Sequence, residues 1–514
     1  MTSYELAEDD PTEEVLPAND DPTEEEVIDS EWRGLHPLSL VANLAPRTWR
    51  TLRGTWPLLA AFAIGGRRDS VAILFIAALF FGMAVWSTVL HFLTLRYRVV
   101  HGRLEMRSGL LNRQNRALDP SRIQNTELVR NPLHKLLGLV ELRVETASGR
   151  EVEGLLSALS EEEGERLLGL LDAARAGSSP STDDEEKAKV LSSADLSDLL
   201  RYGATGLRLG AGIAIAVGLG MEALQFLDPE QYERVPSLIG RVGGAAAVVA
   251  FVSGLFLVAI AGAVQRFWRF TLTVSDGRLV ASQGLLTKRR IQLQLSKVQL
   301  ATVRQPWSKR LLQFASIHVE TAAAHVGDGG TASAEAIIPV VETDDIGALL
   351  AEVIPHADTV WGSELQPPHP RALRRGVLSA IVEGLIIGTV IGLWFGGWAW
   401  VFLLIAPIID VLFAWFDHRH QGWRVTEHLI IARSGYLNRR THVVSRKKIQ
   451  SITLRQGPIL RRWDLAKVVV RVAGSRVDLP LLATAEARHL VDTLTPQARP
   501  VPADGLAATA LSPH

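Results

Sequence analysis

The chain contains no cysteine among its 514 residues. This absence excludes disulfide bonds, thiolate metal sites and cysteine nucleophiles. The sequence also lacks a Walker loop, a dinucleotide-binding fingerprint and an HExxH motif. We interpret His418 and His420, which flank Arg419, as an interfacial cluster and not as metal ligands. The sequence therefore predicts no catalytic residue, no metal, no cofactor and no enzymatic activity.

Basic residues are missing from the first 32 positions, which hold thirteen Asp or Glu and no Lys or Arg. Because the whole chain has a net charge of -1, the remainder carries +12. A segment with so much charge and so few aromatic residues cannot bury enough apolar surface to offset its ordering entropy. We expect residues 1–33 to form a disordered acidic tail, and residues 498–514 a second disordered tail.

Long apolar runs are present in abundance, at a mean hydropathy of +0.15. A helix needs about 20 apolar residues to cross the hydrocarbon core of a bilayer. Five stretches reach that length: Val71–Leu93, Leu209–Leu227, Val242–Val264, Val377–Phe395 and Trp398–Phe416. A sixth around Trp56–Ile64 is shorter, and it either spans or lies in the interface. The runs therefore predict three helical hairpins.

Arginine residues flank these hairpins on one side. They precede and follow the second and third pairs, and Arg96 and Arg98 follow the first, whereas the opposite connections are acidic or uncharged apart from Arg67 and Arg68. Positive flanks remain in the cytoplasm. We expect a multi-pass protein of the cell (cytoplasmic) membrane with cytoplasmic N- and C-termini.

A polar block of about 80 residues follows each hairpin, and the three blocks align. The strings "GRLEMRSGLLNRQNRALDPSRIQ", "GRLVASQGLLTKRRIQLQLSKVQ" and "HLIIARSGYLNRRTHVVSRKKIQ" match without a gap. Their shared glycines, Gly109, Gly284 and Gly435, each stand fifteen residues before a shared glutamine. The blocks read as short antiparallel strands. Each closes with a helical pattern, and Ser160 and Glu163 open the first at capping-box spacing.

Two hydrophobic helices followed by such a block resemble the bacterial pleckstrin-homology-like membrane proteins. The resemblance implies a polytopic α-helical membrane protein with three cytoplasmic PH-like β-barrel or sandwich domains, each closed by a C-terminal helix. The expected order is acidic tail 1–33, hairpin 34–95, domain 96–175, linker 176–204, hairpin 205–266, domain 267–355, linker 356–374, hairpin 375–416, domain 417–497 and tail 498–514. It implies no reaction.

Basic residues gather in the first half of each block. The candidate lipid- or partner-binding residues are Arg113, Arg116, Arg122, Lys288, Arg289, Arg290, Lys297, Arg439, Arg440, Arg446, Lys447 and Lys448. A solvated surface is one interpretation. Because each block starts beside a helix end, the other is a membrane-facing or partner-facing corner, where cations gain about 1 kcal/mol each near an anionic leaflet. Nucleic acid is not expected, because the strings lack interleaved aromatic residues.

The sequence thus predicts a non-enzymatic membrane scaffold that engages anionic lipids, a related PH-like membrane protein or a second copy of itself. The alternative is a subunit of a transporter or channel, and it depends on the intramembrane acids Glu222, Glu383 and Asp410. Glu383 and Asp410 would lie at the same depth in the third hairpin. There they could share a proton or hold a cation, or each could reach the arginines near the helix ends.

Overall fold

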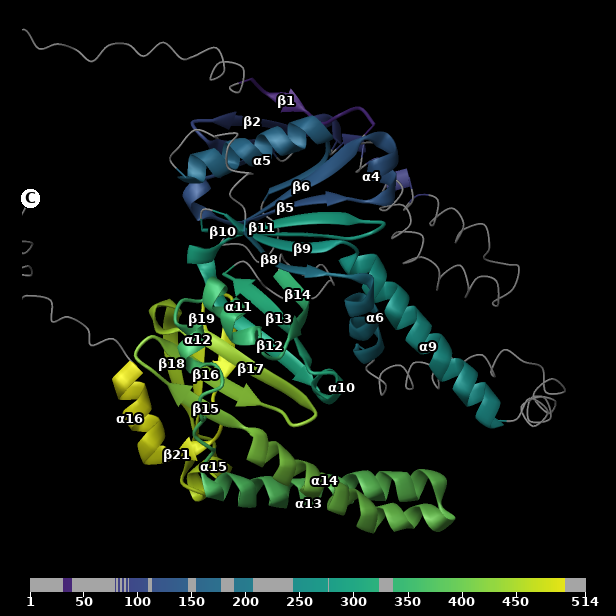
Figure 1. Cartoon of the computed structure of the whole chain (residues 1–514), viewed down its shortest axis with the longest axis vertical. Coiled ribbons are helices and arrows are strands. Elements are labelled where there is room, and N and C mark those ends of the chain that lie inside the picture. Colours follow the sequence, from purple (N-terminus) through teal and green to yellow (C-terminus); the bar gives the residue numbers. More distant parts are fainter. Residues whose placement is uncertain are drawn as a thin grey trace, which may run out of the picture.

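The computed structural model describes residues 31–38, six helical positions between 79 and 90, and residues 92–109, 113–146, 154–176, 189–206, 244–275, 277–322 and 336–494. Within these residues, three units of related topology follow one another along the molecule (Figure 1). Several expectations lie outside the described residues: most of both tails, most of the span 71–93, the segment 56–64, the span 209–227 and Glu222.

Each unit has three antiparallel strands, a single 3-10 turn, further strands and a closing helix. The first unit comprises β2 (Arg96–Val100), β3 (Arg103–Ser108), β4 (Gln114–Leu118), η1 (Pro120–Arg122), β5 (Ile123–Arg130), α4 (Pro132–Leu137), β6 (Leu139–Thr146), β7 (Gly154–Ser160) and α5 (Glu161–Ala176). An N-terminal strand, β1 (Arg33–Gly34), pairs with β2.

The second unit repeats this order after a strand and two helices. It comprises β8 (Lys189–Ala194), α6 (Leu196–Thr205), α9 (Gly244–Phe267), β9 (Phe270–Ser275), β10 (Arg278–Gln283), β11 (Lys288–Gln294), η3 (Leu295–Lys297), β12 (Val298–Pro306), α10 (Trp307–Leu311), β13 (Phe314–Thr321), β14 (Ala336–Glu342), α11 (Ile346–Val353) and α12 (Ala357–Val360). The segment 176–204, expected to be a linker, thus contributes β8, which pairs with β9.

The third unit follows the hairpin of α13 (Pro370–Phe395), η4 (Gly397–Val401) and α14 (Phe402–His420). It comprises β15 (Gly422–Val425), β16 (Leu429–Ser434), β17 (Asn438–Ser445), η5 (Arg446–Lys448), β18 (Ile449–Arg455), α15 (Pro458–Arg462), β19 (Leu465–Val472), β20 (Ser475–Asp478), β21 (Leu482–Ala483) and α16 (Thr484–Leu494). The described strands therefore support three PH-like sandwiches.

The shared glycines adopt one conformation in all three units. Gly109, Gly284 and Gly435 have φ values of 92°, 110° and 81°. A side chain at Gly284 would place its Cβ 1.9 Å from the Thr287 carbonyl oxygen, and one at Gly435 would lie 2.5 Å from that of Asn438. Only glycine adopts this left-handed backbone at low cost. The glycine is therefore required by the turn that precedes the third strand of the unit.

The sheets do not stop at the boundaries between units. We call β4, β11 and β17 the head strands and β5, β12 and β18 the tail strands. The head strand β11 pairs with the tail strand β5 of the preceding unit, which joins both into a seven-stranded sheet. Likewise β17 pairs with β12 in a six-stranded sheet. Consecutive units are thus fused edge to edge.

The hydrophobic cores follow the same arrangement. The core of the second unit includes Leu429, Ile431 and Val443 from the third, and the core of the third includes Leu300 from the second. Each of these side chains is at most 3% exposed. The second and third units therefore share core residues, whereas the core cluster of the first unit contains residues of that unit alone.

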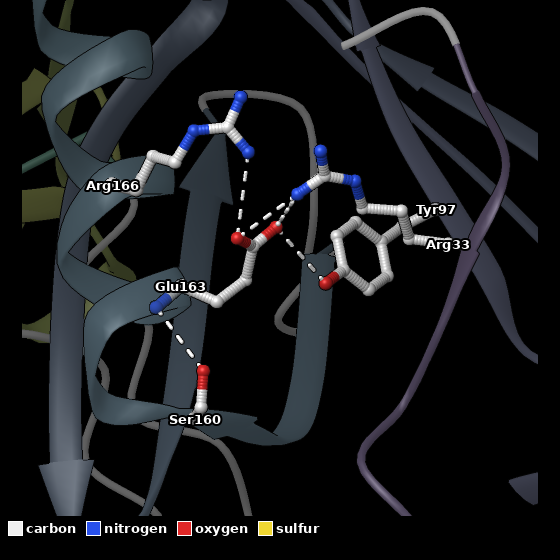
Figure 2. Close-up of polar contacts among 5 residues, drawn as sticks. All are labelled: Arg33, Tyr97, Ser160, Glu163 and Arg166. Atoms are coloured by element: carbon white, nitrogen blue, oxygen red, sulfur yellow. Dashed lines mark hydrogen bonds and ion pairs between the residues drawn. The ribbon is translucent and has the colours of Figure 1, made fainter. Parts of the chain in front are cut away.

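The N-terminal strand is held against the first unit by the carboxylate of Glu163 (Figure 2). Both oxygens of Glu163 accept hydrogen bonds from Arg33, at 2.9 and 3.1 Å, and the Tyr97 hydroxyl donates to Oε1 at 3.3 Å. Burial, assisted by the Glu163 charge, raises the pKa of Tyr97. The backbone amide of Glu163 donates to Ser160 Oγ, which is the bond predicted from capping-box spacing.

Helix α9 packs partly as a core helix. Its buried Ala263 and Phe267 lie against α6, where a side chain at Gly203 would place its Cβ 2.5 Å from the Ile260 Cα. The Tyr202 and Phe267 rings meet edge to face with centroids 5.1 Å apart. The end of this apolar run therefore contributes to the second unit.

The expectation of a polytopic α-helical membrane protein is wrong. Four β-sheets form the body of the described chain, and within it two helices, Pro370–Trp394 and Gly397–His420, are long and apolar enough to cross a membrane. Part of the apolar sequence lies in buried strands and in α9. Hydropathy alone does not separate such runs from membrane spans.

The two long helices pack closely against one another and project away from the sheets (Figure 1). A side chain at Gly384 would place its Cβ 2.4 Å from the Pro407 Cα, and one at Gly388 would lie 2.5 Å from the Phe402 carbonyl oxygen. A Cβ at Gly392 would instead lie 2.7 Å from the indole ring of Trp400. Small residues spaced by four allow this approach between helix backbones in a membrane.

We expect Gly388→Leu to destabilise the hairpin by about 2 kcal/mol, because the new side chain would have to displace the backbone of α14. The measurement is thermal unfolding of the detergent-solubilised protein. Gly376→Leu is the matched control on the same helix, since a Cβ there meets nothing within 4 Å. Equal effects of the two substitutions would contradict the packing.

Candidate anion-binding site

The predicted basic residues occupy two kinds of position. Arg113 directly precedes the exposed head strand β4, and Arg116 lies in it. Lys288, Arg289 and Arg290 lie in β11 and pair directly with residues of β5. Glu127 of β5 is 3.4 Å from Arg289. Part of the predicted set of basic residues therefore lies at the junctions between units.

A second junction contains Arg439 and Arg440 in β17. Burial, with Arg310 and Arg433 nearby, lowers the pKa of Arg439 to about 10. Arg440 pairs with Arg304 of β12 in the strand register. Like the cations of β11, these two residues lie in a strand that pairs with the preceding unit.

The other cations lie in the three 3-10 turns. Lys448 of η5 donates to the Ser296 carbonyl of η3, and Lys297 of η3 donates to the Ser121 carbonyl of η1 at 3.3 Å. Burial, with Lys297 nearby, lowers the pKa of Lys448. The turns therefore form a ladder in which each cation contacts the preceding turn. Arg122 is the exposed residue at the equivalent position of the first turn.

Arg446 holds the third unit together. Its guanidinium donates to the carbonyl oxygens of Thr426 and Glu427, both at 3.2 Å, and to that of Thr493 in α16 at 3.4 Å. Its neighbour Lys447 is exposed. Arg446 is thus bound to backbone, and Lys447 presents its charge to solvent.

A cationic pocket lies where the helical hairpin joins the third unit. Its volume is about 650 Å³, and α13, β16, β17, β19 and β20 contribute to it. The polar and charged side chains that line it are Arg375, Gln421, Ser434, Arg440, His442, Lys467, Arg476 and Asp478. Four cations therefore face one carboxylate.

The carboxylate neutralises only part of this charge. Lys467 Nζ is 2.7 Å from Asp478, and Arg476 is exposed. The Nε atom of Arg375 is buried and has no hydrogen-bond partner among the described residues. Burial, with Arg440 and Arg304 nearby, lowers the pKa of His442 to about 4, so this ring is neutral at pH 7. The pocket can therefore accept an anion.

The hairpin is fixed to this pocket by Asp417 near the end of α14. Asp417 Oδ1 accepts a hydrogen bond from the Tyr436 amide at 2.9 Å, and Oδ2 accepts one from Gln421. The Phe416 and Tyr436 rings stack with centroids 4.8 Å apart. These contacts hold the end of the hairpin against the turn that contains Gly435.

Sequence reasoning missed Lys467 and Arg476 as members of a site. They lie in β19 and β20, well after the basic strings, and only the sandwich brings them beside Arg440. One signal was available. In the repeat alignment Lys467 stands where the earlier units have Glu141 and Ser316, so the third unit has gained a cation at this position.

The two acids of the hairpin line one cavity. Glu383 and Asp410 contribute to a space of about 570 Å³ that shares Arg375 and Gln421 with the cationic pocket. Asp410 Oδ2 is buried and has no hydrogen-bond partner among the described residues. The structure thus brings together the two acids that the sequence placed at one depth.

We expect Glu383→Gln and Asp410→Asn to be non-additive, with a coupling free energy of unfolding above about 0.5 kcal/mol, because neighbours in one cavity interact. The measurement is a double-mutant cycle in detergent between pH 5 and 8. The control pairs Glu383→Gln with Asp492→Asn, an exposed position on α16, and should be additive. Zero coupling at every pH would show that the acids do not interact.

Comparisons with known proteins agree with this architecture. A family model described as Bacterial PH domain matches residues 56–175, 217–355 and 377–498, which together cover well over half of the chain. The UPF0699 transmembrane protein YdbT of Bacillus subtilis (strain 168) is 22% identical over 467 residues, which is 87% of this chain and 94% of the relative.

A second relative, the UPF0699 transmembrane protein YdbS of the same organism, is 32% identical over 108 residues, or 21% of this chain and 67% of the relative. No solved structure matches. Each of the three matched ranges ends within a few residues of the end of α5, α11 or α16. The chain therefore belongs to the bacterial PH domain family, which it contains in three successive copies.

Proposed function

We propose that this protein is a non-enzymatic membrane scaffold that binds anionic phospholipid headgroups in the cationic pocket at the base of the α13–α14 hairpin. The observation that carries the proposal is the position of Arg375, Arg440, Lys467 and Arg476 around one pocket. A phosphodiester is the anion available to such a pocket where a helix leaves a bilayer. Arginine and lysine both bind phosphate, arginine with two parallel hydrogen bonds.

The protein is a membrane-associated member of its family. Both relatives are named transmembrane proteins. The two long helices of this chain are 22% and 6% buried over their most apolar windows. A core helix of a soluble protein would be covered by its neighbours, whereas these helices expose large side chains such as Trp394, Leu404 and Ile408. Lipid is the solvent that suits such a surface.

The hairpin orients the pocket toward the cytoplasmic leaflet in this proposal. Arg371, Arg374 and Arg375 precede its apolar part, and Arg419 and Arg424 follow it. Because positive residues near short connections are retained in the cytoplasm, both helix ends would lie there. The cytoplasmic leaflet also carries the anionic lipids that attract basic residues.

We expect reporters fused after Pro355 and at the C-terminus to lie on the cytoplasmic side, because both flank the arginine-rich end of the hairpin. A pair of reporters, one active only in the cytoplasm and one only outside it, gives the readout in cells. A reporter inserted between Gly396 and Gly397 serves as the control and should give the opposite signal. A cytoplasmic signal from that insertion would contradict the crossing.

We expect full-length protein in detergent to bind phosphatidylglycerol more tightly than phosphatidylcholine. The double substitution Arg375→Gln, Arg476→Gln should weaken phosphatidylglycerol binding about 30-fold, because each cation contributes about 1 kcal/mol. Titration with fluorescent lipid measures the affinity. Added salt should weaken binding through screening.

The matched control for this experiment is Lys447→Gln, Arg488→Gln, which removes two exposed cations from η5 and α16. It should leave the affinity within about twofold. Competition with inorganic phosphate separates a headgroup site from a site for a free anion. Equal binding of both lipids, or equal effects of the two double variants, would contradict the pocket.

A second candidate, a subunit of a transporter or channel, is favoured by one observation. Glu383 and Asp410 line a shared cavity between the hairpin and the third unit, and one oxygen of Asp410 has no hydrogen-bond partner among the described residues. Proton flux into liposomes with and without Glu383→Gln tests this function. Proton flux that is lost on Glu383→Gln would favour the transport function over the scaffold function.

A further inference from the structure

The two junctions between units use the same strand register. In the first, Lys288 pairs with Arg130 and Leu293 with Asn125. In the second, Arg439 pairs with Gln305 and Val444 with Leu300. The ungapped alignment of the repeats makes Lys288 equivalent to Arg439 and Arg130 equivalent to Gln305. The junction is therefore a repeated interface, formed twice by the same positions of the repeat.

The ladder of 3-10 turns repeats with the junctions. Lys297 reaches the Ser121 carbonyl and Lys448 reaches the Ser296 carbonyl, and these two pairs are equivalent in the alignment. Each unit thus presents a head strand with its cation and accepts the next unit on its tail strand. Such an interface is heterologous, because its two sides differ.

One head strand and one tail strand have no counterpart in the described chain. Strand β4 pairs with β3 alone, and β18 pairs with β19 alone. The opposite edge of the first sheet differs, because β1 covers β2 there. The first unit therefore keeps an open head strand, and the third keeps an open tail strand.

Because neither strand has a second neighbour among the described strands, both are more exposed than their equivalents in the other units. In the tail strands β5 and β12 nearly every residue is buried, whereas in β18 every residue is half-buried or exposed. Four of the five residues of β4 are exposed. β18 retains the alternating apolar residues Ile452 and Leu454, which pack against the core of the third unit. Both edges are thus available for strand pairing.

We propose that β4 of one chain pairs with β18 of a second copy, so that the chain assembles head to tail through the interface it already forms twice internally. The repeat alignment fixes the register: Gln114 faces Arg455, Ala117 faces Ile452 and Leu118 faces Ser451. Arg122 then donates to the carbonyl oxygen of Lys447 in the second copy, as Lys297 and Lys448 do within the chain.

The charges on the open head strand do not oppose this pairing. Lysine and arginine often protect sheet edges from association. Yet β11 carries Lys288, Arg289 and Arg290 and is fully paired. The second junction even sets Arg304 opposite Arg440. In the proposed register no cation of β4 faces a cation of β18 directly, unlike Arg304 and Arg440 at the second junction.

A second copy is the occupant that the structure favours, because each half of the interface already has its complement in this chain. A head-to-tail contact either closes into a ring or continues as an open array. A one-unit relative could occupy the same edges, and that outcome would overturn the proposal for a second copy.

The absence of cysteine permits a direct test by cross-linking. Gln114→Cys and Arg455→Cys, both at exposed positions, are placed on separately tagged full-length chains that are expressed together in membranes. Oxidation should join the two tags in a disulfide, because directly opposite strand residues have Cβ atoms about 5 Å apart. Gln114→Cys with Ser451→Cys is the out-of-register control, displaced by about 13 Å, and should give at least tenfold less product.

Two further measurements make the result decisive. Arg304→Cys with Arg440→Cys on one chain is the positive control, because these residues are opposite in the internal junction. The native mass of the unmodified protein in detergent should exceed the 56.1 kDa of one chain. If the positive control forms its disulfide but the tags stay separate, or Gln114→Cys joins to a different protein, the proposed assembly is wrong.

Discussion

Hydrogen bonding between strands of successive units is the constraint on which this structure depends. The pairs β5 with β11 and β12 with β17 carry both sheets across the unit boundaries, and at the second boundary the cores on either side also share residues. An exposed strand edge is a template for further pairing, and a chain that repeats one unit meets that template in its own next copy. At the junctions, strand edges that would otherwise be unpaired connect one unit to the next.

Fusion of the sheets also fixes the α13–α14 hairpin relative to the second and third units. The hairpin is attached to the third unit through Asp417 and Tyr436, and the third unit is attached to the second through β12 and β17. The cationic pocket lies between these two attachments. Its four cations come from a helix and three strands, so the pocket depends on a rigid joint that a flexible linker would not provide.

Local patterns in the sequence predicted much of this organisation. The ungapped repeat predicted three equivalent units and aligned the glycines before each head strand, although their left-handed conformation was not predicted. Pairing between units was not predictable in this way, since it joins strands more than a hundred residues apart. Lys467 and Arg476 were missed beside Arg440 because the folding of the sandwich, and no local pattern, brings these side chains together. Hydropathy predicted the third hairpin but overstated the helical membrane character of the chain.

The junctions also explain why basic residues recur at fixed positions of the repeat. Binding to a lipid surface would be served by a cation at any exposed position. Contacts between units, such as those of the turn ladder, need a cation at one particular position of the repeat. Arg289 lies beside Glu127 of the preceding unit, and Lys297 and Lys448 reach carbonyl oxygens of the preceding turns. At the 3-10 turns, recurrence in register thus coincides with contact between units, and the charges that are not repeated, Arg375, Lys467 and Arg476, belong to the third unit and its hairpin. Repeated residues thus lie at the contacts between units, and unrepeated ones line the cationic pocket of the third unit.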